Sequence, residues 1–197
     1  MRHGMSFDAH KVEVYTKKLT NMETGLFPPI LKDGSINAII ETPRGSQNKY
    51  VYDPEMKVFK LKKTLPMGTV FPFDFGFVPN TEGEDGDPLD VLIIMEQPTF
   101  AGCLIECRLL GILEATQKEK GKSLIRNDRM VAVSTASILY RNLHDISELN
   151  RNMVKEIENF FIDYNKHEGR KFTPVRWRNG SKAVNMIKKA IKSTSLH

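Results

Sequence analysis

Residues 85–95 read Asp-Gly-Asp-Pro-Leu-Asp-Val-Leu-Ile-Ile-Met, an acidic turn that runs directly into an apolar stretch. Gly86 allows a tight turn between the first two carboxylates, and Pro88 restricts φ just before the third. The apolar run over residues 91–95 has the length and composition of a buried strand. The segment therefore predicts several carboxylates held close together at the entrance of a strand.

Asp85, Asp87 and Asp90 are accordingly the first candidate metal ligands. Like charges so close together repel and raise one another's pKa unless a cation neutralises them. Oxygen ligands suit hard divalent cations, Mg²⁺ first and Mn²⁺ as an alternative. An EF-hand is disfavoured, because the sixth position of such a loop needs glycine and this chain has Asp90 there. The alternative interpretation is a solvated acidic loop, since Asp, Gly and Pro are all common in turns.

The hydrophobic pattern changes period along the chain. Short strand-like runs separated by turn residues are expected at residues 36–42, 49–52, 57–61, 70–78, 91–95, 103–113 and 130–134. From Leu149 to Tyr164 apolar residues recur at helical spacing, with Ser147 as the expected N-cap and Gly169 as the stop. A second short helix is expected after Gly180, capped by Ser181. Many strands without alternating helices predict a mainly β fold, a barrel with C-terminal helices packed on it.

The bulk properties limit the class of protein. The chain has 197 residues, enough for one well-buried domain, with an N-terminal arm expected at residues 1–35 and a single domain at 36–197. No apolar run reaches the ~20 residues of a membrane span, and the N-terminus lacks the apolar core of an export signal. Cys103 and Cys107 lie too far apart on one strand to form a disulfide, which favours a reducing cytoplasm. The net charge of +5 does not choose between anionic partners.

Several motifs resemble those of the soluble family I inorganic pyrophosphatases. Residues 85–91 match all seven positions of that family's signature, which reads Asp-x-Asp-Pro-aliphatic-Asp-aliphatic. Glu41-Thr42-Pro43 with Lys49-Tyr50, the aromatic run at residues 71–77 and Phe-Phe-x-x-Tyr at residues 160–164 resemble further family elements. The resemblance spans about residues 36–190. It implies an OB-like closed β-barrel with flanking helices and a metal-dependent hydrolysis of pyrophosphate to two orthophosphates.

The same resemblance implies roles for individual residues. Asp85, Asp87 and Asp90 would face a metal cluster, with Asp87 as the general base for the attacking water. Glu41 would support a further metal ion, through water. The residues that would hold the two phosphoryl groups are Lys49, Lys63, Tyr164 and Lys166. For each lysine, the alternative is a solvated surface charge.

The chain also departs from the family pattern. Val51 stands where the family has Glu, Lys63 where it has Arg, and Phe71 and Phe75 where it has Tyr. The family's second acidic cluster, an Asp followed by Asp-x-Lys, is the most altered part. Direct alignment places its two Asp positions at Gln117 and Asn127, whereas a shift of one residue places the second at Asp128.

Arg129 then replaces the lysine of that cluster and becomes a candidate phosphate ligand. We hypothesise that Asp128 supplies the shared metal ligand, supplemented by Glu114 or Glu119. The competing interpretation makes Asp128 an ordinary turn residue.

Three functions compete at this point. The first is a Mg²⁺-dependent inorganic diphosphatase of the cytoplasm, self-associated as a homo-oligomer and acting on neither nucleic acid nor membranes. The second is a hydrolase of another phosphoanhydride or phosphoester, which the altered acidic cluster favours. The third is a catalytically weakened OB-like binding protein. Nucleic-acid-binding barrels present exposed aromatic residues beside a basic groove, whereas the aromatic run here lies beside an acidic cluster.

Overall fold

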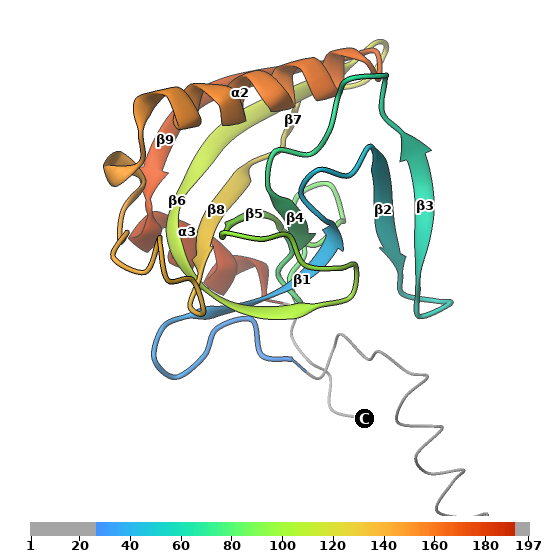
Figure 1. The fold of residues 1–197 in the computed structure, drawn as a ribbon. Coiled ribbons are helices and arrows are strands. Elements are labelled where there is room, and N and C mark those ends of the chain that lie inside the picture. Colours follow the sequence, from blue (N-terminus) through green and yellow to red (C-terminus); the bar gives the residue numbers. More distant parts are fainter. Residues whose placement is uncertain (1–26, 192–197) are drawn as a thin grey trace, which may run out of the picture.

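Five strands pair in a closed circuit in the computed structural model, which describes residues 27–191. They are β1 (Ile36–Thr42), β4 (Asp74–Phe77), β5 (Asp90–Ile94), β8 (Arg129–Ser134) and β6 (Leu104–Glu119). Each pairs with the next in that order, and β6 pairs back with β1. Only β5 and β8 are parallel within this circuit. The pairing confirms the predicted mainly β, OB-like closed barrel, whose curvature is visible in Figure 1.

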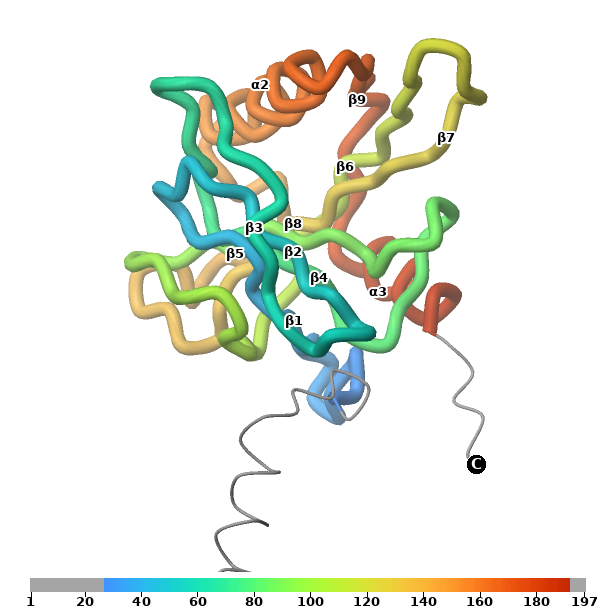
Figure 2. Tube along the Cα trace, turned by 90° about the vertical axis from the view of Figure 1, so that its right-hand side faces the viewer, coloured from blue at the N-terminus to red at the C-terminus, as the bar shows by residue number. Residues whose placement is uncertain are grey.

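The remaining elements decorate this barrel. β7 (Ile125–Arg126) and β9 (Arg170–Asn179) both pair with β6, while β2 (Asn48–Asp53) and β3 (Val58–Thr64) form a separate hairpin at its side (Figures 1 and 2). A 3-10 turn, η2 (Ile146–Glu148), precedes α2 (Arg151–Lys166), and α3 (Gly180–Ala190) follows β9. The two helices confirm the predicted C-terminal helical region.

Both faces of the central strands are buried, each in a different core. Along β5, Leu92 and Ile94 pack in a cluster with Phe161 of α2, while Val91 and Ile93 pack in another with Ile187 of α3. Successive side chains on a strand point to opposite faces, so one continuous apolar run supplies both cores. Burying each such side chain contributes roughly 1.5–3 kcal/mol. The acidic loop is therefore anchored on a strand that is covered on both sides.

A glycine is required where β4 pairs with β1. A Cβ at Gly76 would lie 2.0 Å from the Ile39 carbonyl oxygen, closer than any side chain tolerates. The register between β1 and β4 shifts just beyond this point, between Ile40 and Thr42. The bend places Glu41 and Thr42 beside the β2–β3 hairpin, where the Thr42 hydroxyl accepts a hydrogen bond from the Tyr50 amide at 3.1 Å.

The largest differences between the predicted and the observed elements concern β4, β6 and β9. β4 covers only Asp74–Phe77 of the expected strand at residues 70–78, and β6 continues six residues beyond Leu113 to Glu119. β9 was not predicted at all, because its ten residues, Arg-Lys-Phe-Thr-Pro-Val-Arg-Trp-Arg-Asn, lack an apolar run. It is a strand because it pairs with β6 from Gly111 to Glu119, and a bulge accommodates Pro174.

The helix caps were predicted in the wrong places. Asn150, not Ser147, caps α2, accepting a hydrogen bond from the Asn152 amide at 2.8 Å. Asn179, not Ser181, caps α3 through the amide of Lys182. Both caps follow the local preference for Asn at this position, but neighbouring polar residues made the choice ambiguous.

Two further predictions concern the cysteines and the N-terminus. Cys103 and Cys107 are both free thiols, as expected. The expected arm at residues 1–35 lies mostly outside the described residues; its last part, from residue 27, rests on the barrel. There the Pro28 carbonyl accepts a hydrogen bond from Asn37 at 2.8 Å, and the Phe27 carbonyl accepts one from Asn80 at 3.1 Å. The boundary at residue 36 stays a prediction.

Candidate active site

A cleft of about 600 Å³ opens between the barrel, the β2–β3 hairpin and α2. Its lining includes Val51, Phe71 and Phe75, so the three apolar departures from the family pattern all face it. Four acidic and four basic side chains also line the cleft, namely Glu41, Asp85, Asp87, Asp90, Lys49, Lys62, Arg129 and Arg170. A cavity of this size, with charges of both signs, is suited to a small, highly charged ligand.

The acidic loop forms a tight turn at the rim of the cleft. Gly86 adopts φ 84°, a conformation that glycine tolerates and other residues rarely adopt. The Gly83 amide donates to the Asp87 carbonyl at 2.8 Å, and the Asp87 amide donates to a carboxylate oxygen of Asp85 at 3.2 Å. Within residues 27–191, neither Asp85 nor Asp87 forms an ion pair with a basic side chain. The turn therefore presents two carboxylates to the cleft.

The environment of Asp85 disfavours its charged form. The cleft walls partly desolvate this carboxylate and raise its pKa, although the side chain remains accessible to solvent. The hydrogen bond from the Asp87 amide opposes the shift, and the nearby charges of Asp87 and Asp90 add to it. Excess negative charge thus gathers at the loop, and a cation bound there would be stabilised.

Asp90, the third aspartate, already has a cationic partner. Its carboxylate lies 2.7 Å from the guanidinium of Arg129, which is itself buried. Burial raises the pKa of Asp90, while the positive charges of Arg129 and Lys49 oppose the rise. The Arg129 guanidinium also lies over the Phe161 ring, 5.2 Å from its centroid. Arg129 therefore links the first strand residue of β5 to the core beneath α2.

Glu41 and Lys49 form a second pair on the opposite wall. The Lys49 ammonium lies 2.8 Å from one Glu41 oxygen, and the Tyr52 amide donates to the other at 2.9 Å. The same ammonium lies 4.1 Å from the centroid of the Phe75 ring, a cation–π contact. Both members of the pair line the cleft. The metal and phosphate roles that the resemblance implies for them stay predictions.

Tyr164 lines the cleft from α2 beside several cations. Burial, together with the nearby Asp90 charge, raises its pKa to about 12, so its hydroxyl stays protonated and can donate a hydrogen bond. The Lys63 ammonium lies 3.9 Å from the centroid of the Tyr164 ring and contacts the Glu168 carboxylate. Burial, together with the positive charges of Arg170, Lys49 and Lys62, lowers the pKa of Lys63 to about 8.

Two basic residues of the cleft were missed by sequence reasoning, and two that were expected there, Lys63 and Lys166, are absent from its lining. Lys62 and Arg170 line the cleft, whereas Lys166 is exposed in the last turn of α2 and contributes nothing to the lining. The expectation for Lys166 is therefore not supported by its position. Arg170 became recognisable only through β9, which places it beside β6 and holds it 2.8 Å from Glu168.

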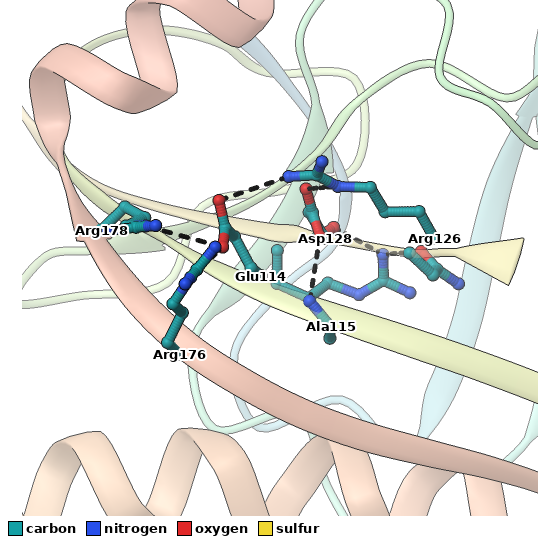
Figure 3. Close-up of polar contacts among 8 residues, drawn as sticks. Glu114, Ala115, Arg126, Asp128, Arg176 and Arg178 are labelled. Carbon is teal, nitrogen blue, oxygen red and sulfur yellow. Dashed lines mark hydrogen bonds and ion pairs between the residues drawn. The ribbon is translucent and has the colours of Figure 1, made fainter.

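Asp128, the residue proposed above as a shared metal ligand, does not line the cleft, and both of its carboxylate oxygens have partners within the chain. One of its oxygens accepts from the Ala115 amide at 2.9 Å, and the other lies 2.6 Å from Arg126 (Figure 3). Burial raises its pKa, against these two hydrogen bonds. It lines a neighbouring cavity of about 330 Å³ that extends to α3. This cavity shares four polar or charged lining residues with the cleft, namely Asp85, Asp90, Asn127 and Arg129. Asp128 thus has local partners for both oxygens, as a turn residue would, and its role as a metal ligand stays a prediction.

The carboxylates proposed to supplement Asp128 are also engaged by cations. Glu114 lies 2.6 Å from Arg176, and Figure 3 shows Arg126 and Arg178 on its other sides. Glu119 lies in the hairpin between β6 and β7, 3.1 Å from Lys122. Neither lines the cleft. The compensating metal ligands predicted from the sequence are therefore not where that hypothesis needs them.

Gln117 and Asn127 occupy the cleft instead. The Asn127 side-chain amide donates to the Gln117 side-chain oxygen at 2.9 Å, and both residues line the cleft. The direct alignment that placed them at the second acidic cluster is consequently the one that agrees with the geometry. Arg129, the neighbour of Asp128, faces the same cleft.

Comparisons with known proteins show the family of this chain. The sequence model of the family described as inorganic pyrophosphatase matches residues 38–195. An inorganic pyrophosphatase of Streptomyces coelicolor is 38% identical over 154 residues, 78% of this chain and 91% of that protein. Another, from Synechocystis sp., is 34% identical over 172 residues, 87% of this chain and 99% of that protein. This chain belongs to the inorganic pyrophosphatase family.

Solved structures of inorganic pyrophosphatases have the same fold. The structure from Thermus thermophilus superposes with a TM-score of 0.76 at 31% identity, covering 85% of this chain and 96% of that one. The structure from Neisseria gonorrhoeae gives a TM-score of 0.76 at 29% identity, with 85% and 96% covered. The architecture of this chain is therefore that of the solved inorganic pyrophosphatases.

We expect Arg170 and Lys166 to differ in their effect on the enzyme. Arg170→Ala should raise KM for pyrophosphate by about tenfold, because a charge-assisted contact in the cleft contributes about 1.5–3 kcal/mol. Lys166→Ala should leave KM within about twofold, since an exposed lysine contributes little. Steady-state release of orthophosphate measures both. Equal effects of the two substitutions would contradict this placement.

The Glu114 cluster predicts a pH dependence of stability. The hydrogen bond and charge of Arg176 lower the pKa of Glu114 below its usual 4.5. A lowered carboxyl pKa adds stability that is present above 4.5 and is lost as pH falls through the folded-state value. Glu114→Gln should therefore reduce the loss of stability on acidification, measured as the urea midpoint at pH 7 and at about pH 3.5.

The control for this measurement is Glu156→Gln on α2. Glu156 is exposed and forms no ion pair within the described part of the chain, so its replacement removes a carboxyl without disturbing a cluster. The fall in the urea midpoint on acidification should be smaller for Glu114→Gln than for Glu156→Gln. Identical shifts would mean that the arginine cluster does not contribute to acid sensitivity.

Proposed function

We propose that this chain is an inorganic diphosphatase, a hydrolase that converts pyrophosphate into two orthophosphates in the cleft. The observation that carries the proposal is the arrangement of charge: two unpaired carboxylates on one side and basic groups around the remaining walls. Pyrophosphate is a multiply charged anion whose hydrolysis needs both neutralisation of charge and acceptance of a proton. Membership of the inorganic pyrophosphatase family agrees with this assignment.

The donor set at the loop fits a divalent cation bound together with phosphate. Within residues 27–191, no group of three or more His, Cys, Asp or Glu side chains is placed to hold a metal ion. Mg²⁺, however, is commonly bound through one or two carboxylates together with substrate phosphates, rather than in an all-protein cage. Asp85 and Asp87 are the carboxylates without an ion pair, so they would hold it. Bound Mg²⁺ or Mn²⁺ supplies neutralisation of phosphate charge and a water of lowered pKa.

Glu41 and Asp90 differ from the two carboxylates of the turn, because each already pairs with a basic side chain. The ammonium of Lys49 and the guanidinium of Arg129 already neutralise them. We therefore assign them to the orientation of those two basic groups, with contact to a metal ion only through water. For Glu41, this assignment agrees with the water-mediated metal contact expected from the sequence. For Asp90, it limits the expected metal contact to one through water.

Phosphate binding and proton transfer are assigned to side chains of the cleft and its surroundings. Lys49, Arg129 and Arg170 bind and orient phosphoryl oxygens, and the protonated Tyr164 hydroxyl donates to them. The Lys63 ammonium contacts the Tyr164 ring, so we assign Lys63 the role of positioning that ring. A water oxygen bonds to one phosphorus while the bridging oxygen leaves with the other phosphoryl group, and Asp87 accepts the proton of that water.

The experiment is a measurement of orthophosphate released from pyrophosphate by the purified full-length chain. We expect turnover with Mg²⁺ or Mn²⁺ and none after treatment with EDTA. A panel of nucleotides and polyphosphate tests the second candidate, a hydrolase of another phosphoanhydride, which the neutral pair Gln117 and Asn127 favours. Turnover of a nucleotide that exceeds turnover of pyrophosphate would replace the proposal with that alternative.

Partners and location follow as finer proposals. The four carboxylates in the cleft disfavour a nucleic-acid backbone as ligand, because phosphate contacts require basic surface. In the part of the chain that the structure describes, no helix has the length and apolarity needed to cross a bilayer. We propose a cytoplasmic homo-oligomer, testable by fractionation and by light scattering of the purified protein.

A further inference from the structure

A chain of polar contacts runs along one wall of the cleft, from Gln117 on β6 through Arg129 on β8 to Asp90 at the start of β5. Gln117 of β6 accepts a hydrogen bond from Asn127 at 2.9 Å, and the Asn127 oxygen accepts one from Arg129. Arg129 also donates to the Asp128 carbonyl at 2.9 Å and reaches Asp90 at 2.7 Å. The two amides have no charge, so the only ionised group that they support is the Arg129 guanidinium.

Within residues 27–191, the carboxylates that neighbour Gln117 and Asn127 along the chain do not line the cleft. Asp128 is bound by Arg126 at 2.6 Å and by the Ala115 amide. Glu114 is bound by Arg176 at 2.6 Å, and Glu119 by Lys122 at 3.1 Å. Those partners are groups of the same chain and are present at every metal concentration. The wall therefore offers a divalent cation no free carboxylate.

Arg129 stands where such a cation would have to approach. Its guanidinium is buried, it contacts the Asp90 carboxylate directly, and it packs over the Phe161 and Phe172 rings at 5.2 and 5.8 Å. A second positive ion beside it would be repelled, since charges separated by a few ångströms in a partly desolvated site interact strongly. The planar guanidinium is, by contrast, well suited to bind phosphate oxygens.

We propose that Arg129, held by Asn127 and Gln117, is a built-in cation that takes the place of a divalent metal ion at Asp90. The free protein then binds a single divalent cation, at Asp85 and Asp87, and any further ion enters only in complex with the diphosphate. This inference rests on the proposed function, because it concerns the metal and substrate of the same cleft. Its consequence is that the cleft takes up metal in two steps: one ion binds to the free protein, and any further ion arrives bound to the diphosphate.

The test counts bound Mn²⁺ in the absence of turnover. Equilibrium dialysis with detection of free Mn²⁺ by electron paramagnetic resonance should give about one ion per chain for the free protein, and more with methylenediphosphonate, which cannot be hydrolysed. Two or more ions on the free protein, or none, would overturn the proposal. An unchanged count with the analogue would overturn the claim that further ions enter with the diphosphate.

The matched variants are Gln117→Asp with Asn127→Asp, which restore two carboxylates to the wall. We expect this pair to raise the count for the free protein from about one ion to about two. Asn127→Asp alone serves as a milder variant should the pair fail to fold. Asn152→Asp, at an exposed position on α2, adds a carboxylate outside the cleft and should leave the count unchanged.

These outcomes are independent of catalysis. If the chain shows no hydrolysis of pyrophosphate, the proposed function fails, while the ion counts still decide this inference. If hydrolysis occurs and the counts of the wild-type and doubly substituted proteins are equal, the function stands and this inference fails.

Discussion

Replacement of Asp87 by Asn should lower kcat for pyrophosphate hydrolysis by about 10³-fold or more, because positioned general bases contribute about 10²–10⁴. The amide keeps the shape of the side chain but cannot accept the proton of the attacking water, and it is a weaker ligand for a cation. Asp87 is exposed at the rim of the cleft, and its amide and carbonyl, not its carboxylate, make the hydrogen bonds of the turn. The variant should therefore fold normally.

The control is Asp163→Asn on α2, which makes the same chemical change at an exposed position away from the cleft. Orthophosphate release at saturating pyrophosphate and Mg²⁺ should remain within about twofold of wild type, as for a typical surface substitution. Circular dichroism and the urea midpoint establish that both variants are folded. An Asp87→Asn protein that keeps more than about a tenth of the activity would exclude Asp87 as the general base.

Lys49→Met should lower the free energy of unfolding by about 3–5 kcal/mol, which is the usual cost of removing one partner of a buried ion pair. The side chains of Lys49 and Glu41 are only 7% and 13% exposed, so the substitution leaves the Glu41 carboxylate largely desolvated and without a cation. Adding Glu41→Gln should restore most of the loss. The neutral Gln can still accept the hydrogen bond of the Tyr52 amide, which now ends on Glu41 at 2.9 Å.

The matched control lies on the same hairpin. Lys60 pairs with Asp53 at 2.7 Å, a contact as short as that of Lys49, but the Lys60 side chain is 52% exposed. Lys60→Met should therefore cost at most about 1 kcal/mol. Urea unfolding measures all three proteins. The doubly substituted protein should regain stability but not activity, because the phosphate-binding ammonium of Lys49 remains absent; equal destabilisation by Lys60→Met and Lys49→Met would refute the role of burial.

The strands with clear local patterns were predictable. β1, β5 and β8 lie where continuous apolar runs bounded by turn residues indicated strands, because burial of both faces leaves its mark on every residue. β9 has no such apolar run. Its arginines, lysine and proline resemble a loop, and it becomes a strand only through the register that pairs Gly111 with Asn179 and Glu119 with Arg170. Pairing depends on the partner strand, which a local pattern does not contain.

The sequence by itself determined the acidic turn of residues 85–90, because glycine, proline and the following apolar strand are local constraints that position Asp85, Asp87 and Asp90. It did not decide between Asn127 and Asp128. That choice depends on a shift of one residue, and in an extended chain such a shift sends each side chain to the opposite side. Only the tertiary structure, which holds Asp128 against Arg126 and the Ala115 amide, turns Asn127 and Arg129 into the cleft.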